Sequence, residues 1–188
     1  SYAASGGLHG VGASVVNALS SRLDVEVDRG GKTHGMSFRR GVPGVFDGPD
    51  PDATFSKKSG LEILGKAPRT RTGTRVRWWL DPQVFTKDAD YERVTLRERA
   101  VQSTFLVPGL TITLRDLRDP ADLWEESLQH KGGLTEYVQY LAEGTSVCSV
   151  IHLRGSGHFH ETVPVLDDKG HLTSQEVERD LGVDIALQ

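Results

Sequence analysis

The sequence has little sulfur. It contains one cysteine, Cys148, and one methionine among its 188 residues. A single thiol excludes an internal disulfide and a zinc site built from several cysteines, so we expect a protein of the reducing cytoplasm. No run of residues approaches the about 18 consecutive apolar positions that a membrane-spanning helix needs, and we therefore predict no membrane partner.

An excess of positive charge is also absent. Lysine and arginine number 22, aspartate and glutamate number 26, and the net charge is -4. Nucleic-acid-binding modules usually show the opposite balance, so this stretch alone is not expected to bind DNA generally. Hydrophobic residues make up 37% and charged residues 26% of the chain, which excludes a disordered protein and indicates a globular one.

Neither end of the sequence has the pattern of a natural terminus. The chain begins at Ser1 rather than methionine, without the pattern of a signal peptide. At the other end, residues 183–187 alternate like a strand up to Gln188. We therefore interpret the sequence as an internal segment of a longer protein.

Periodicity predicts a mixture of strands and helices. Arg29-Gly30-Gly31-Lys32 has the composition of a hairpin turn, Gly41 to Gly44 is expected to end the returning strand, and residues 47–54 have the composition of an exposed loop. Apolar residues alternate, as in strands, over 23–27, 74–78, 110–114, 151–153 and 183–187, and they take helical spacing over 13–20, 91–105 and 134–141. Short hairpins recur, so we predict an antiparallel α+β fold rather than a doubly wound parallel sheet.

A glycine-dense loop, Gly6-Gly7-Leu8-His9-Gly10-Val11-Gly12, stands directly before the first predicted helix. Glycine lets the backbone approach a ligand closely, and the free N–H groups of a helix start suit a phosphate. The loop is neither a P-loop, since no Gly-Lys-Ser/Thr follows, nor a Rossmann fingerprint, since its third glycine position falls on Val15. On these grounds alone, a surface loop before a helix remains an alternative.

The residues around this loop carry a family resemblance. Tyr2, the run from Ser5 to Gly12 and the continuation Ser14-Val15-Val16-Asn17-Ala18-Leu19-Ser20 closely resemble the ATP-lid motif of bacterial type II DNA topoisomerase ATPase subunits. These are the B-type subunits of gyrase and their topoisomerase IV equivalents, which belong to the GHKL ATPases. Residues 72–79 resemble the family strand that lies against the adenine, and residues 131–141 resemble the start of the family's transducer domain.

The resemblance implies a fold and a domain organisation. The expected fold is the C-terminal half of a GHKL (Bergerat-type) ATPase sandwich, followed by the start of the transducer domain. The charged, poorly periodic stretch 116–133 is the place where we expect the boundary. We therefore predict a partial ATP-binding domain at 1–128 and a truncated transducer domain at 129–188.

The resemblance also implies the site residues. Arg29, in the hairpin turn, corresponds to an arginine at the mouth of the family's ATP pocket that aminocoumarin inhibitors contact. Thr74 is expected against the adenine. The residues expected to bind ATP are Tyr2, Gly7, Leu8, His9, Gly10, Val11, Gly12, Ala13 and Thr74.

The cofactors implied are ATP and Mg2+, but the resemblance places the catalytic groups elsewhere. The family's general-base glutamate, magnesium-binding asparagine and adenine-binding aspartate lie upstream of Ser1, and its phosphate-contacting lysine loop lies downstream of Gln188. We therefore assign no catalytic residue and no metal ligand in this segment. The segment alone is expected not to turn over ATP.

For the intact protein, the resemblance implies ATP hydrolysis coupled to DNA strand passage. The implied partners are DNA, contacted mainly through other domains, an A-type topoisomerase subunit, and a second copy in an ATP-dependent homodimer. The alternatives are another GHKL ATPase, of the mismatch-repair or chaperone type, or a paralogue gated by nucleotide without hydrolysis. Residues 14–20 argue against the first alternative.

One departure from the family pattern supports the second alternative. The family has Lys-Val after the tyrosine, whereas this sequence has Ala3-Ala4. Loss of a charge-assisted contact to phosphate costs roughly 1.5–3 kcal/mol. We expect weaker ATP binding or compensation by another cation.

Two other groups of residues have a functional and a structural interpretation. His152, His158 and His160 could hold a metal, but surface histidines near a turn are the simpler interpretation. The alternating arginines at 69, 71, 75 and 77 could contact phosphate or a partner, or they could form a solvated sheet face.

Overall fold

The computed structural model describes residues 11–58, 60–142, 144, 146 and 148–188. The chain divides into two compact units, Ser1–Asp90 and Tyr91–Gln188, each described by itself below. This division falls well before residue 128. That a transducer domain begins at residue 129 remains a prediction.

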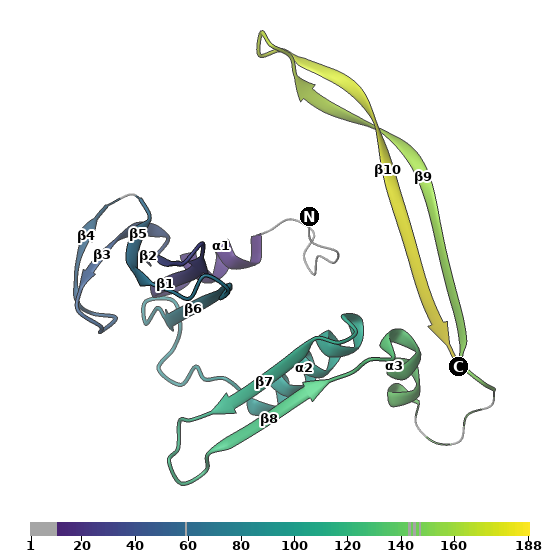
Figure 1. Ribbon diagram of the computed structural model, residues 1–188, viewed down its shortest axis with the longest axis horizontal. Coiled ribbons are helices and arrows are strands. Elements are labelled where there is room, and N and C mark those ends of the chain that lie inside the picture. Colours follow the sequence, from purple (N-terminus) through teal and green to yellow (C-terminus); the bar gives the residue numbers. More distant parts are fainter. Residues whose placement is uncertain (1–10, 59, 143, 145, 147) are drawn as a thin grey trace. The chain divides into compact units, whose positions relative to one another are not determined.

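The first unit is built on an antiparallel sheet with the strand order β4-β3-β2-β1-β6, in which β5 also pairs with β2 (Figure 1). The helix α1 (Val11–Ala18) precedes the sheet. The strands are β1 (Ser20–Arg29), β2 (Lys32–Arg39), β3 (Val42–Asp47), β4 (Thr54–Lys57), β5 (Glu62–Lys66) and β6 (Gly73–Leu80). Every strand pair of this sheet is antiparallel, which confirms the predicted α+β class.

Side-chain alternation gives the centre of this sheet two different faces. On one face, Leu23 and Val25 of β1 lie opposite apolar residues of both neighbouring strands. Asp24, between Leu23 and Val25, lies opposite Arg77 on the other face of the sheet, which is polar. The apolar face is formed by Leu23, Val25, Met36, Phe38, Val76 and Trp78.

Two tight turns connect β1 to β2 and β2 to β3. The predicted turn at Gly30-Gly31 is confirmed, with φ angles of 61° and 81° that suit a type I′ hairpin. In the second turn, Arg40 has a φ of 49° and Gly41 a φ of 79°. The expectation that residues 41–44 merely end a strand was wrong, because β3 begins at Val42, immediately after this turn. Gly41, Pro43 and Gly44 have the composition of a loop. In the structure, Gly41 lies in the turn, and Pro43 and Gly44 belong to β3.

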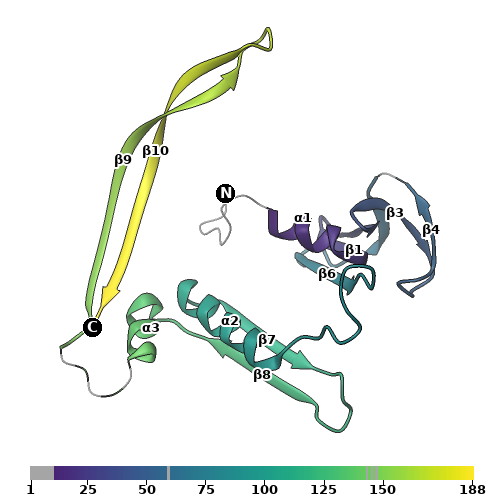
Figure 2. The ribbon, with the colours of Figure 1, turned by 180° about the vertical axis from the view of Figure 1, so that it is seen from behind.

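In its described residues, the second unit contains two helices and two separate antiparallel ribbons. Helix α2 lies along the β7–β8 ribbon (Figures 1 and 2). Its side chains Ala100, Val101, Thr104 and Phe105 are buried. The elements are α2 (Arg93–Leu106), β7 (Thr111–Asp116), β8 (Trp124–Gln129), α3 (Gly133–Leu141), β9 (Ile151–Leu166) and β10 (Leu172–Leu187).

Several predictions for this unit were incomplete. Tyr91 precedes α2 rather than belonging to it, and Val94 is 67% exposed, whereas Val101 and Phe105 are buried. The strand β8 lies inside the stretch that was interpreted as a boundary. Strands β9 and β10 each contain 16 residues and pair along their whole length, so the predicted strands at 151–153 and 183–187 are only their outer ends.

Among the described residues, no helix combines the length and the apolar character needed to cross a membrane.

Candidate nucleotide-binding site

The start of α1 holds the part of the predicted lid that the structure describes. Val11, Gly12 and Ala13 form the first turn of this helix. The N–H groups of a first turn have no partner within the helix, and they lie at the positive end of its dipole. The predicted lid residues Tyr2, Gly7, Leu8, His9 and Gly10 lie outside the described residues.

A hollow of about 440 Å³ lies between α1 and the apolar face of the sheet. Its volume falls within the range of about 300–1,000 Å³ that is usual for small-molecule sites. The side chains of Val76 and Trp78 in its wall are 46% and 44% exposed. The hollow is lined by Ala13, Ser14, Val16, Asn17, Leu23, Val25, Phe38, Val76 and Trp78.

Asn17 is a polar residue in this otherwise largely apolar lining. Its side-chain oxygen Oδ1 is buried and, within the part of the chain that the structure describes, has no hydrogen-bond partner. A buried amide oxygen normally accepts a hydrogen bond, so this atom is an unsatisfied acceptor at the base of α1. Asn17 is not among the residues predicted to bind ATP. Its only signal in the sequence is a single amide within the run Val15-Val16-Asn17-Ala18.

Thr74 shares the apolar face but does not line the same hollow. It lies opposite Val27 and two residues before Val76, so its side chain belongs to the same side of β6 as Val76. It lines a second hollow of about 470 Å³ at the edge of the sheet, together with residues of the polar face such as Glu26 and Arg75. The structure thus brings Ala13 and Val76 to one hollow and places Thr74 at the adjoining end of β6.

Arg29 lies at the end of β1, where the turn to β2 begins, and it is exposed. The register places its neighbour Asp28 opposite Gly73, the first residue of β6. Arg29 is therefore at the same end of the sheet as Thr74.

Two of the four arginines of the predicted basic patch are paired with carboxylates of the polar face. Arg75 contacts Glu26 at 2.8 Å, and Arg71 contacts Asp28 at 2.7 Å. Hydrogen bonds from the Thr33 hydroxyl and from Arg71 hold the pKa of Asp28 below its usual value. Arg75 and Arg77 lie on the face opposite the apolar hollow, in agreement with the solvated-face interpretation.

Two of the three histidines of β9, His152 and His158, contact carboxylates of β10. The Nε2 atom of His152 lies 2.5 Å from Asp184 Oδ1, and the Nδ1 atom of His158 lies 2.6 Å from Asp180 Oδ1. The hydrogen bond with His152 lowers the pKa of Asp184. Across residues 11–58, 60–142 and 148–188, no group of three or more histidine, cysteine or acidic side chains is arranged to hold a metal ion.

Comparison with known proteins identifies relatives of this chain, although no protein-family model matches it. The DNA gyrase B protein of Halalkalibacterium halodurans is 39% identical over 140 residues, which are 74% of this chain and 19% of that protein. The DNA gyrase B protein of Staphylococcus aureus is 39% identical over 142 residues, or 76% of this chain and 20% of the relative. The chain thus spans about a fifth of the length of these relatives.

A solved structure with a similar fold is the 43K ATPase domain of gyrase B from Thermus thermophilus, crystallised in complex with an aminocoumarin. The similarity has a TM-score of 0.61 and 33% sequence identity, and it covers 81% of this chain and 39% of that one. At this level of identity and coverage, the similarity extends to the sequence as well as the fold.

Proposed function

The chain belongs to the GHKL ATPases of the DNA gyrase B family, and on this basis we propose that it forms the phosphate lid and one wall of the purine pocket in the ATP site of a type II DNA topoisomerase. The observation that carries the proposal is the hollow between the first turn of α1 and the apolar face of the sheet. There, a helix N-terminus suited to phosphate and an apolar wall suited to a purine ring adjoin each other.

The phosphates are held by the lid. Backbone N–H groups between Gly7 and Ala13 donate hydrogen bonds to the triphosphate, and the Tyr2 hydroxyl contributes a further contact. Support comes from the position of Val11, Gly12 and Ala13 in the first turn of α1. Leu8, His9 and Gly10 complete the glycine-rich lid by sequence.

The purine ring lies on the apolar face of the sheet. Val76 and Val25 supply apolar contacts, and the hydroxyl of Thr74 bonds to the purine edge or to a bridging water. Arg29, at the same end of the sheet as Thr74, is the candidate contact for an aminocoumarin, the inhibitor type bound to the Thermus thermophilus domain.

The proposal gives this segment neither a catalytic base nor a Mg2+ ligand. When bound, Mg2+ would offset the negative charge of the phosphates, and its ligands would come from other parts of the full-length protein. The region from residue 129 onwards is assigned to the start of the transducer domain, which would pass the state of the ATP site to the rest of the molecule.

For the full-length protein, the proposed activity is ATP-driven passage of one DNA duplex through another. Its partners are DNA, an A-type topoisomerase subunit and a second copy that joins on ATP binding. Its location is the cytoplasm. These assignments rest on the relatives, of which this chain spans 19–20%.

The test uses the full-length protein mixed with its A-type partner and a closed circular plasmid. We expect ATP hydrolysis that is stimulated by DNA, and ATP-dependent changes of linking number in even-numbered steps, because a duplex passes through a double-strand break. Nucleotide binding without hydrolysis would favour the non-hydrolysing alternative. Absence of nucleotide binding would reject the proposal.

A further inference from the structure

The C-terminal end of α1 is held by segments that are far apart in the sequence. The backbone N–H of Asp81, just after β6, donates to the carbonyl of Leu19 at 3.2 Å. The backbone N–H of Arg40, in the β2–β3 turn, donates to the carbonyl of Ser20 at 3.1 Å. Leu19 and Ser20 directly follow α1, so the two bonds fix the point where the helix joins the sheet (Figure 2).

An ion pair joins the two residues that make these bonds. The Arg40 guanidinium donates to the Asp81 carboxylate through Nε and, at 3.2 Å, through Nη2. The Asp81 carboxylate, with a side chain only 2% exposed, also accepts the backbone N–H of Gln83 at 3.0 Å. The hydrogen bonds from Arg40 and then from Gln83 lower the pKa of Asp81, so it carries a charge at neutral pH.

The rest of α1 lacks comparable support. None of its residues is buried, and its inner side lines the hollow described above. The remaining bonds at its end are local: Ser20 Oγ donates to the Val16 carbonyl at 2.6 Å, and the Leu19 N–H donates to the Val15 carbonyl at 3.0 Å. The helix is therefore fixed at its C-terminal end, while its N-terminal end faces the proposed phosphate site.

Arg40 also has an unusual backbone conformation. Its φ of 49° lies in the left-handed region, which asparagine and glycine adopt more readily than arginine. A residue chosen for the turn alone would be asparagine, so the arginine side chain has a role beyond the turn.

We propose that the Arg40–Asp81 ion pair is a positioning pair for the ATP lid: it fixes the base of α1, and through the helix it sets where Val11 to Ala13 present their N–H groups to the nucleotide. This inference rests on the proposed function. Neither residue is placed in contact with the nucleotide. Both act through the helix.

The experiment compares Arg40→Asn, Asp81→Asn and the control Arg39→Gln in the full-length protein. Arg40→Asn keeps a residue that suits the turn and removes only the ion pair. Arg39 is the neighbouring arginine, but it bonds to the Ala53 carbonyl at 2.7 Å and stacks on Phe46, so it supports the β3–β4 hairpin rather than α1. Arg40→Lys, which keeps the cation, should recover part of the loss.

Two readouts are measured. Without nucleotide, the amides of α1 should exchange hydrogen faster in Arg40→Asn and Asp81→Asn than in Arg39→Gln, while the amides of β1 and β2 remain protected. The Kd for a non-hydrolysable ATP analogue should rise by about tenfold in Arg40→Asn and Asp81→Asn. This factor corresponds to losing about one charge-assisted hydrogen bond between the displaced start of α1 and a phosphate. The Kd of the double variant for the analogue should be no higher than that of either single variant, because each substitution already removes the same ion pair.

Wild-type affinity in Arg40→Asn, or equal loss of protection throughout the first unit, would overturn the inference. If the wild-type protein itself fails to bind the analogue, the proposed function fails instead. In that case the exchange comparison, which needs no nucleotide, still decides whether the pair anchors α1.

Discussion

Val25 of β1 and Val76 of β6 lie directly opposite each other in the antiparallel register, on the sheet face that α1 partly covers. Their neighbours Asp24 and Arg77 are paired in the same way on the opposite face. Adjacent residues of β6 therefore belong to two different environments. One is the proposed purine wall and the other is a solvated, charged surface.

This alternation predicts opposite results for the same substitution at adjacent positions. Val76→Gln places an amide in the purine wall, and the Kd for an ATP analogue should rise by about tenfold or more, because a polar group without a partner costs about 1–3 kcal/mol. Arg77→Gln should leave the Kd unchanged. Calorimetric titration of both variants measures the difference, and equal effects would place the nucleotide elsewhere.

Thr74→Val tests the proposed hydrogen bond to the purine without changing side-chain volume. Losing a neutral hydrogen bond should weaken ATP binding by about 0.5–1.5 kcal/mol. The matched control is Thr113→Val in β7, whose hydroxyl bonds with Ser127 Oγ at 2.8 Å and lines neither hollow. Thr113→Val should leave the affinity for ATP unchanged. If both variants bind ATP like the wild type, Thr74 has no role in binding.

The hairpin turn between β1 and β2 should depend on its glycines. Gly30 has a φ of 61°, and a Cβ added there would meet no atom within 4 Å, so Gly30→Ala reports backbone strain alone. The free energy of unfolding should fall by about 1–2 kcal/mol in urea titrations. Gly65→Ala in β5 is the control, because the space around it is equally open and its φ is not positive. Equal losses at both positions would show that the turn conformation is not the cause.

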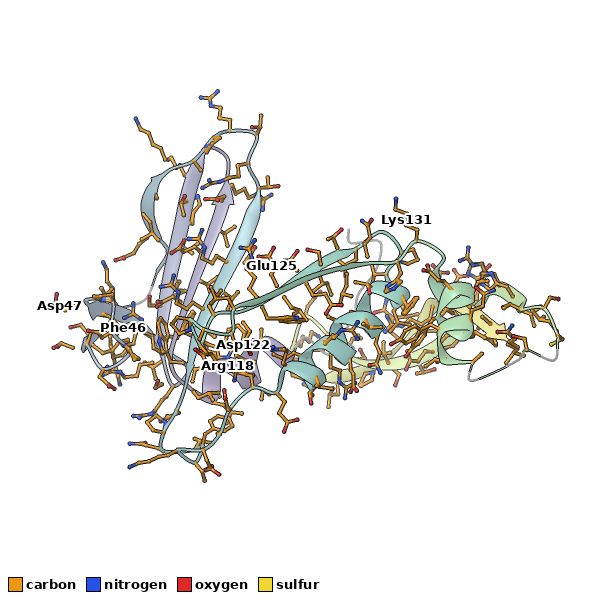
Figure 3. The ribbon with its side chains drawn as sticks, turned by 90° about the horizontal axis from the view of Figure 1, so that it is seen from below. Phe46, Asp47, Arg118, Asp122, Glu125 and Lys131 are labelled. Carbon is orange, nitrogen blue, oxygen red and sulfur yellow. The ribbon has the colours of Figure 1, made fainter. Side chains whose placement is uncertain are left out.

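The acid sensitivity of the second unit should depend on Asp116. Its pKa is lowered mainly by hydrogen bonds from the side chain and backbone of Arg118, and also by Arg93. Arg118 and Asp122, whose carboxylate bonds to Arg93, both lie in the β7–β8 connection (Figure 3). A folded-state pKa below the unfolded value of about 3.9 means that the charged carboxylate stabilises the fold above that pH and loses this effect as the pH falls.

Asp116→Asn should therefore lower stability most at neutral pH, and the difference from the wild type should narrow as the pH falls below about 4. Unfolding curves recorded across the acid range measure this. Glu125→Gln, which breaks the exposed pair with Arg115, is the control and should have a small effect at any pH. A difference for Asp116→Asn that does not vary with pH would exclude a role for its charge.

Local sequence signals predicted the elements whose patterns are regular. The alternation at 23–27 and 74–78, the glycine pair at 30–31 and the helical spacing of 134–141 each correspond to an element of the structure. These signals come from residues close together in the sequence. Their side chains also separate apolar from polar positions clearly.

The elements that were missed are supported by pairing between distant residues. In β8, Glu125 pairs with Arg115 and Glu126 pairs with Arg97. These two adjacent charged residues interrupt the alternation of apolar and polar positions, so the strand has a weak pattern in the sequence. The middle of β9 contains Gly155 and Gly157, which interrupt the apolar pattern. For the same reason, neither the Arg40–Asp81 pair nor the unpartnered Asn17 oxygen could be predicted, since both depend on tertiary contacts.

The most direct test of the central claim is hydrogen exchange of the full-length protein with and without a non-hydrolysable ATP analogue. The analogue should slow exchange of the amides of the lid, residues 7–13, and of residues 73–78 in β6, while the β7–β8 ribbon of the second unit is unaffected. Saturating binding that leaves both of these segments unprotected would contradict the account and place the nucleotide site outside this part of the protein.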